Sequence, residues 1–298
     1  QLATGTALDN AGNQASISAT VNIDATAPTI SGSAPAANSH GWHNRPVTVT
    51  WTCDDTLSGV ASCSDSTTLL DEGAAQSASA HATDAAGNTA TATVSGISID
   101  TTAPTVSAVV PATVTGWYRD DVVVHWDCAD ALSGVAACPA DDIVTLDGTT
   151  TLVGIVTDAA GNTASAEVTI RIDRAAPVIV GSASPAPNAN GWNRTPVTVA
   201  FTCTDDISGI AGCSSASVVG DGTDQSVTGS ATDVAGNSAT TTVSGIDVDT
   251  VAPSLSGAAT SVPNAQGWFN HAVSVHWTCT DDRSGVDAAT CQIGRAHV

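Results

Sequence analysis

The sequence predicts an all-β fold built from tandem β-sandwich domains. Short segments alternate between apolar and polar residues, which is the period of a strand with one buried face. These segments recur, with the same tryptophan and cysteine positions, at a shift of about 75 residues. No stretch shows helical periodicity over the ~12 residues that a stable helix needs. The 298 residues are therefore predicted to form several small domains.

Each repeat contains a Gly-Trp pair and then two cysteines. The tryptophans are Trp42, Trp117, Trp192 and Trp268; the first cysteines are Cys53, Cys128, Cys203 and Cys279; the second cysteines are Cys63, Cys138, Cys213 and Cys291. A motif Asp-x-Ala-Gly-Asn follows, and a segment with Asp and a final Pro ends the repeat. The motif begins at Asp84, Asp158 and Asp233, with a related copy at Asp9, and the segments end at Pro28, Pro104, Pro177 and Pro253.

The Pro-terminated segments are the predicted domain boundaries, because proline cannot donate a hydrogen bond inside a sheet. Three complete repeats are expected, at 29–104, 105–177 and 178–253. Residues 1–28 are expected to hold the last hairpin of a preceding repeat, and 254–291 the first part of a following one. Residues 292–298, QIGRAHV, resemble a translated sequencing adaptor and are expected to be a non-native tail.

The strand before each first cysteine shows the alternation most clearly. In the first repeat it places Val47, Val49, Trp51 and Cys53 on one face. A period of two with one polar face is typical of an antiparallel sheet that covers a core on one side, so a second sheet must cover the other. The motif that begins at Asp84 is predicted to be the turn of a later hairpin, because Asp, Gly and Asn favour such turns.

The repeated pattern GWxxxPVTVxWTCxDxxSGVAxC, followed by TDxAGN and IDxTAP, resembles bacterial immunoglobulin-like repeats of secreted and cell-surface proteins. The resemblance covers residues 1–291. It implies an immunoglobulin-like sandwich that serves as a spacer or an adhesive module, usually in long arrays. The neighbouring repeats of the same chain are then its first partners.

Composition limits the classes of partner that we expect the protein to bind. Asp and Glu number 29 against seven Arg and no Lys, which gives a formal charge of -22. Such a surface repels phosphate backbones and anionic headgroups, so we expect neither nucleic acid nor a membrane surface as a partner, whereas cations are attracted. Solubility is the favoured interpretation of the acidic charge. No apolar run approaches the ~20 residues that cross a bilayer.

The cysteine spacing favours disulfides over a metal site, because no CxxC pair occurs. The predicted local bridges are Cys53–Cys63, Cys128–Cys138 and Cys203–Cys213. Each clips the end of one strand to the end of the next, unlike the antibody bridge, which links two sheets across the core. Disulfides place the protein in an oxidising compartment, so we expect it to be secreted or displayed at the cell surface.

Aspartates recur beside the turns and the boundaries. The candidates for a structural Ca²⁺ site are Asp84, Asp158 and Asp233 in the hairpin turns and Asp100, Asp173 and Asp249 beside the boundaries; Asp55, Asp130, Asp205 and Asp281 recur two places after a cysteine. Ca²⁺ takes six to eight oxygen ligands, so several groups must converge. The competing and favoured interpretation is that each Asp caps a turn through backbone N–H groups. No other cofactor is expected.

Two functional hypotheses remain open. No recurrent Ser, His and Asp set is present, so the chain is predicted to be a non-catalytic spacer or stalk region of an adhesin-like protein. The alternative is an array that binds carbohydrate or protein, in some cases as an accessory to a secreted hydrolase. In that case the Gly-Trp loops would present Trp42, Trp117, Trp192 and Trp268 for stacking on a ligand; ordinary packing of these rings is the favoured interpretation.

Overall fold

The computed structural model describes residues 1–287, 290–291 and 294–296. All regular secondary structure in this part is β-strand, which confirms the all-β prediction. No helix among the described residues has the length and apolarity that a bilayer crossing requires. The chain forms two compact units, residues 1–111, 123–143 and 151–169 in one and 112–122, 144–150 and 170–298 in the other. The division passes inside the repeat predicted at 105–177.

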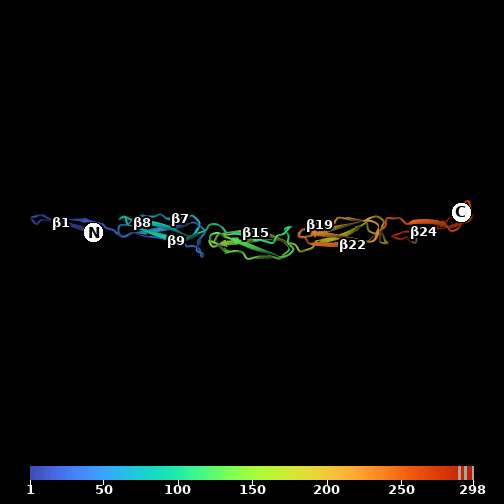
Figure 1. Cartoon of the computed structure of the whole chain (residues 1–298), viewed down its shortest axis with the longest axis horizontal. Helices are drawn as coiled ribbons and strands as arrows, with labels where there is room; N and C mark the ends of the chain where they lie inside the picture. Colours follow the sequence, from blue (N-terminus) through green and yellow to red (C-terminus); the bar gives the residue numbers. More distant parts are fainter. Residues whose placement is uncertain (288–289, 292–293, 297–298) are drawn as a thin grey trace. The chain divides into compact units, whose positions relative to one another are not determined.

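In the first unit, residues 29–99 form two sheets with the strand orders β3-β5-β7 and β4-β9-β8-β6. The strands are β3 (Thr29–Ser33), β4 (Trp42–His43), β5 (Val47–Asp54), β6 (Val60–Cys63), β7 (Thr67–Leu69), β8 (Gly73–Asp84) and β9 (Thr89–Ile99). The long β8–β9 hairpin is visible in Figure 1. Strand β4 is parallel to β9, whereas the other pairs are antiparallel. The chain therefore changes sheets between β3 and β4, as an immunoglobulin-like sandwich requires.

The core lies between these two sheets. Val47, Val49 and Trp51 of β5 are buried, and the residues between them are exposed, because successive side chains on a strand project to opposite faces. They pack against buried residues of β8 and β9, which include Ala80 and Ile99. The predicted inward face of this strand is thus confirmed.

The second unit contains the same arrangement at residues 178–248. Its sheets have the orders β16-β18-β20 and β17-β22-β21-β19. The strands are β16 (Val178–Ser184), β17 (Trp192–Asn193), β18 (Val197–Thr204), β19 (Ile210–Cys213), β20 (Ser217–Val219), β21 (Gly222–Asp233) and β22 (Ser238–Val248). Val197 and Val199 are buried with Ile246 and Val248, and Phe201 takes the place that tryptophan has in the first repeat.

Residues 105–172 form sheets with the orders β10-β11-β13 and β12-β14-β15. The strands are β10 (Thr105–Val109), β11 (Val122–Ala129), β12 (Val135–Ala137), β13 (Asp142–Val144), β14 (Gly148–Asp158) and β15 (Thr163–Ile172). Val122, Val124 and Trp126 of β11 are buried, as the alternation predicts.

The ends of the chain carry fewer strands. β1 (Leu2–Leu8) and β2 (Gln14–Thr20) form a two-stranded sheet, and β23 (Ser254–Ala259), β24 (Val273–Thr280) and β25 (Gly294–Ala296) form a three-stranded one. The predicted domain boundaries fall between β2 and β3, β9 and β10, β15 and β16, and β22 and β23; they stay predictions. Of the tail predicted to be non-native, 292–293 and 297–298 lie outside the described residues.

Disulfide bonds join the predicted cysteine partners and a fourth pair. They are Cys53–Cys63, Cys128–Cys138, Cys203–Cys213 and Cys279–Cys291. The predicted contrast with the antibody bridge is only partly correct. Cys53 is in β5 and Cys63 is in β6, and these strands belong to different sheets. The bridge is local in sequence and still ties the two sheets together, because the chain changes sheets between β5 and β6.

Glycines facing the core aromatic residue are a packing feature that sequence reasoning missed. A Cβ atom added to Gly154 of β14 would lie 2.5 Å from the Trp126 ring, and one added to Gly229 of β21 would lie 2.6 Å from the Phe201 ring. Real Cβ contacts are not this short, so any larger residue there would force the ring to move. In the second and third repeats the aromatic ring of the cysteine-bearing strand thus packs directly on a glycine of the facing sheet, whereas Ala80 holds this position in the first repeat.

Candidate functional site: the linkers between repeats

The described chain has four linkers, defined as residues 24–28, 100–104, 173–177 and 249–253, each starting at an aspartate. The first residue of three of them is buried: Asp100 and Asp173 are 0% exposed and Asp249 is 9% exposed. Asp24 is half-buried. A carboxylate is rarely buried without partners, so the contacts of these residues define the site.

The linker aspartate binds a loop of the next repeat. Asp100 Oδ2 accepts a hydrogen bond from the backbone N–H of Ser133 at 3.0 Å, while Oδ1 accepts one from Thr102 N within the linker at 3.1 Å. The serine bond recurs at every linker: Asp24 with Ser58, Asp173 with Ser208 and Asp249 with Ser284. The serine begins the Ser-Gly pair between the two cysteines, which explains the presence of that pair in each repeat.

The hairpin turn of the next repeat holds the linker backbone. Asn162 Nδ2 donates to the carbonyl oxygens of Asp100 at 2.9 Å and Thr102 at 3.1 Å. Asn88 does the same for Asp24 and Thr26, and Asn237 for Asp173. The asparagine is itself fixed by the turn aspartate, since Asp158 accepts from both the backbone and the side chain of Asn162. The Asp-x-Ala-Gly-Asn motif thus forms a turn and clamps a linker.

The preceding repeat also forms hydrogen bonds or ion pairs with the linker. Glu72, just before β8, accepts hydrogen bonds from Thr101 N at 2.8 Å and from the hydroxyl of Thr102 at 2.9 Å. Asp221 accepts the equivalent bonds from Thr250, at 2.7 Å from its N–H and 3.0 Å from its hydroxyl. In the linker 173–177, Arg174 forms ion pairs with Asp121 and Asp147, which belong to the preceding repeat. Both neighbours therefore hold the linker.

Three aspartates converge beside each of the first three linkers. The clusters are Asp24, Asp55 and Asp84; Asp100, Asp130 and Asp158; and Asp173, Asp205 and Asp233, each with carboxylate oxygens within 4.8 Å of one another. The structure brings Asp100 to Asp158 and Asp173 to Asp233. Asp84 joins Asp24, and Asp249 lies near the loop of Asp281 through Ser284. Sequence reasoning did not assign Asp24, Asp55, Asp130 and Asp205 to the site, although the recurrence of Asp two places after the cysteine was the available signal.

Amide donors offset the mutual repulsion of these carboxylates. The pKa of Asp24 is lowered, first by the Ser58 side chain and then by the backbone of Thr26. Burial raises the pKa of Asp84, but hydrogen bonds from Asn88 and Gly87 outweigh it, and the net pKa is lowered. Hydrogen bonds from Thr101 and Thr102 lower the pKa of Glu72. These hydrogen bonds therefore favour the ionised forms of Asp24, Asp84 and Glu72.

The clusters also have the chemistry of a hard-cation site. Carboxylate oxygens are the ligands that Ca²⁺ prefers, and a cation would neutralise three like charges held within 4.8 Å. Most of these oxygens accept turn N–H bonds, as the turn-capping interpretation predicts; Asp130 Oδ1, for example, accepts from Leu132 and Gly134. Asp130 Oδ2 accepts no bond from the described residues. Whether an ion binds stays a prediction.

The Gly-Trp loops contact the next repeat. Asn38 Oδ1 accepts from Trp42 N and closes the loop, and Asn38 Nδ2 donates to the carbonyl oxygens of Ala159 at 2.8 Å and Ala160 at 3.1 Å in the following hairpin turn. Arg119 likewise donates to Gly236 O at 3.2 Å. The Gly-Trp loop of one repeat thus contacts the hairpin turn of the next repeat.

The loop tryptophans differ in exposure. Trp42, Trp117 and Trp192 are half-buried, whereas Trp268 is 73% exposed. Trp42 and Trp192 begin the short strands that pair with β9 and β22, so their backbones belong to the sandwich. Ligand stacking by these residues stays a prediction.

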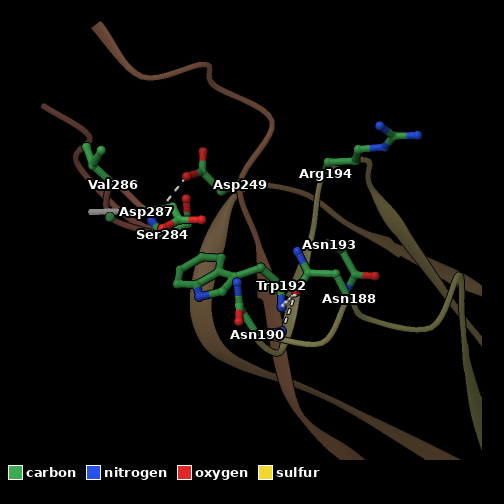
Figure 2. Close-up of a pocket in the computed structure, with 10 residues that line it drawn as sticks. Asn188, Asn190, Trp192, Asn193, Arg194, Asp249, Ser284, Val286 and Asp287 are labelled. Carbon is green, nitrogen blue, oxygen red and sulfur yellow. Dashed lines mark hydrogen bonds between the residues drawn. The ribbon is translucent and has the colours of Figure 1, made fainter. Parts of the chain in front are cut away.

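Figure 2 shows a pocket of about 520 Å³ near the last linker, with Trp192 and Asn188 on one side and Asp249 and Ser284 on another. Asn188 Oδ1 accepts from Trp192 N at 3.0 Å, as Asn38 does from Trp42. Among the described residues, Asn188 Nδ2 has no acceptor, in contrast to Asn38.

No protein-family model and no curated protein matches the sequence. Among solved structures, the chain is similar to a 1.5-MDa bacterial ice-binding adhesin, with 16% identity, a TM-score of 0.31, and coverage of 76% of this chain and 100% of the other. It is similar to protocadherin gamma B2 cadherin domains 3–6, with 12% identity, a TM-score of 0.29 and 83% coverage of each chain. A tetra-tandem repeat from the extending region of a large adhesion protein matches at 16% identity and a TM-score of 0.24, covering 99% of this chain and 80% of that one. Likenesses this weak assign no ligand and no activity to this chain.

Proposed function

We propose that the chain is a non-catalytic spacer or stalk region of a secreted or cell-surface bacterial protein of adhesin type. The hydrogen bonds that two neighbouring repeats make to the same linker, which we call the clamp, carry this proposal. Glu72 of one repeat and Ser133 and Asn162 of the next bind the same short segment, so adjacent sandwiches are held in register instead of being freely jointed. A spacer needs such a joint, because flexible joints would let the array collapse.

The disulfides suit the same role. In the complete repeats each joins cysteines with a sequence separation of 10, which contributes roughly 2–3 kcal/mol in a chain-entropy description. A local bridge also leaves most of the repeat free to extend if force unfolds it. The partners expected for such an array are its own neighbouring repeats and, through other modules, a surface protein or glycan.

The linker clamp can be tested by the distance distribution between spin labels on two repeats. Ser79 and Val153 are exposed strand positions of the first unit and accept labelled cysteines. A narrow distribution is expected for the parent chain, and a broader one after Asn162→Ala, which removes the bonds to Asp100 and Thr102. The matched control is Asn13→Ala: Asn13 makes the same bond to its turn aspartate, Asp9, and donates to no linker among the described residues. A broad distribution in the parent would contradict the spacer proposal.

Two narrower proposals accompany it. We propose a structural cation such as Ca²⁺ at the three-aspartate clusters, supported by the convergence of their oxygens.

The alternative function, recognition of a glycan or protein by the Gly-Trp loops, is supported by the partial exposure of Trp192 beside an open pocket. A glycan array compares the parent with Trp192→Ala; binding that requires the ring would favour recognition over the spacer role.

A further inference from the structure

Each disulfide encloses the loop that binds a linker. In the second repeat Cys128 lies in β11 and Cys138 directly follows β12, with a sequence separation of 10. Between them Ser133 donates its N–H to the buried Asp100 carboxylate of the linker at 3.0 Å. We call residues 129–137 the clamp loop of this repeat. The bridge therefore joins the two ends of a loop that belongs to the clamp.

The other repeats enclose an equivalent loop in the same way. The serines that bond a linker aspartate are Ser58 between Cys53 and Cys63, Ser208 between Cys203 and Cys213, and Ser284 between Cys279 and Cys291. The coupling of bridge and clamp loop is therefore a property of the repeat and not of one junction.

The clamp loop adds little to the core of its own sandwich. All three residues of β12 are exposed, as are all four residues of β6 in the first repeat. These edge strands thus bury no apolar side chain. The pairing of β12 with β14 is also interrupted by a register shift between Val135 and Ala137. Segments with few apolar contacts open locally at a lower free energy than the core.

Hydrogen bonds also attach the clamp loop to its own sandwich. The Gly134 carbonyl accepts from Ala159 N at 2.9 Å or less, and Ser133 Oγ accepts from Ala160 N at 3.3 Å, both in the hairpin turn. Each such bond contributes little net free energy, because water replaces the partner when the loop opens. The bridge restricts both ends of the loop at once and therefore contributes more than either bond.

The bridge lies where a reductant can reach it. Cys63, Cys138 and Cys213 are exposed, and the cysteines to which they are bonded are half-buried. A dithiol reduces such a bond by thiol–disulfide exchange: its thiolate attacks one sulfur, a mixed disulfide forms, and its second thiol then closes the reductant's own disulfide. Two electrons and two protons pass to the cysteine pair, which becomes two thiols.

We propose that each disulfide is a redox lock on the joint between two repeats. Oxidation fixes the clamp loop and with it the serine N–H that binds the linker aspartate, whereas reduction frees the loop while the sandwich core stays folded. The array is thus more flexible while its cysteines are reduced, and it stiffens when a thiol oxidant closes the bridges in an oxidising compartment. This inference rests on the clamped linker of the proposed function and adds the chemical condition under which the clamp is complete.

Nuclear magnetic relaxation of the ¹⁵N-labelled full chain tests the lock at the second repeat. The order parameter of the Ser133 N–H reports the clamp loop, and that of Val124, a buried strand residue, reports the sandwich. In the oxidised parent both are expected to be about 0.85. In the double variant Cys128→Ser with Cys138→Ser, the value for Ser133 is expected to fall below about 0.6, while that for Val124 stays unchanged.

The matched control opens the equivalent bridge of the third repeat. Cys203→Ser with Cys213→Ser should mobilise Ser208, which bonds the next linker, and leave Ser133 ordered. Reduction of the parent chain by dithiothreitol should mobilise both serines, and reoxidation should restore their order.

The outcomes separate the lock from the clamp. If Ser133 stays ordered without its bridge, the lock is overturned and the clamp remains. Equal loss of order at Ser133 and Val124 also overturns the lock, because the bridge then holds the sandwich instead of the joint. A mobile Ser133 in the oxidised parent contradicts the clamp itself, and with it both the lock and the spacer function.

Discussion

Asp100 and Ser133 are separated by 33 positions and belong to successive repeats, yet the Asp100 carboxylate accepts the Ser133 N–H at 3.0 Å. The carboxylate is fully buried, so the bond is shielded from water. The same pair recurs at each described linker, so each linker aspartate is bonded to a loop of the repeat that follows it.

Asp100→Ala is expected to destabilise the repeat that follows the linker. The substitution leaves the N–H groups of Ser133 and Thr102 without acceptors, at a cost of about 1–3 kcal/mol. Urea unfolding measures the change. Asp127→Ala, at an exposed position with no bond to a described side chain, is the control and should change stability little; equal losses for both variants would contradict the clamp.

Acid should weaken the clamp. The pKa values of Asp24, Asp84 and Glu72 are lowered in the folded chain by the hydrogen bonds that they accept. Groups with depressed folded pKa values bind fewer protons in the native than in the unfolded state, so their stabilisation is present above the unfolded value, 3.8 for Asp, and is lost as the pH falls through the folded value. Denaturant titrations from neutral pH downward should show a decline that begins near pH 4; a flat profile to about pH 2 would be inconsistent with these shifts.

Gly154→Ala should destabilise the second repeat by about 1–3 kcal/mol, because the new methyl group would lie 2.5 Å from the Trp126 ring. Thermal unfolding followed by Trp fluorescence reports the loss. Gly212→Ala is the control, since an added Cβ there meets nothing within 4 Å. A stable Gly154→Ala variant would mean that the ring does not occupy this position.

A structural cation would raise the melting temperature. At a free Ca²⁺ concentration of 100 times Kd, a site that exists only in the folded chain gains about 2.7 kcal/mol. Melting in Ca²⁺ and in EDTA should therefore differ, and Asp130→Asn, which keeps the Oδ1 acceptor for Gly134, should reduce the difference. Identical melting temperatures in both solutions would contradict the cation proposal and favour turn capping as the role of the clusters.

The strands and disulfides could be predicted from the sequence because their signals are local. The alternation through Val47, Val49 and Trp51 specifies a face directly, and Cys53 and Cys63 are close enough to suggest their own pairing. That these cysteines lie in different sheets could not be predicted, because periodicity does not say which sheet a strand joins.

The site was harder to predict because its members come from separate segments. Asp24, Asp55 and Asp84 meet only after the linker, the Ser-Gly loop and the hairpin turn have folded together. The six aspartates that the sequence indicates lie in two recurring motifs, the hairpin turn and the Pro-terminated segment, whereas Asp55 is one of two adjacent acids in a loop. The clamp by Glu72 has no motif at all, since Asp147 and Asp221 replace it in the other repeats.

The most direct test of the clamped linker is the backbone order of Thr101 and Thr102, whose N–H groups donate to Glu72 and Asp100. Nuclear magnetic relaxation of a ¹⁵N-labelled chain gives their order parameters. The clamp predicts values of about 0.85, equal to those of the sandwich strands, whereas values below about 0.6 would show a freely moving linker and contradict the spacer function.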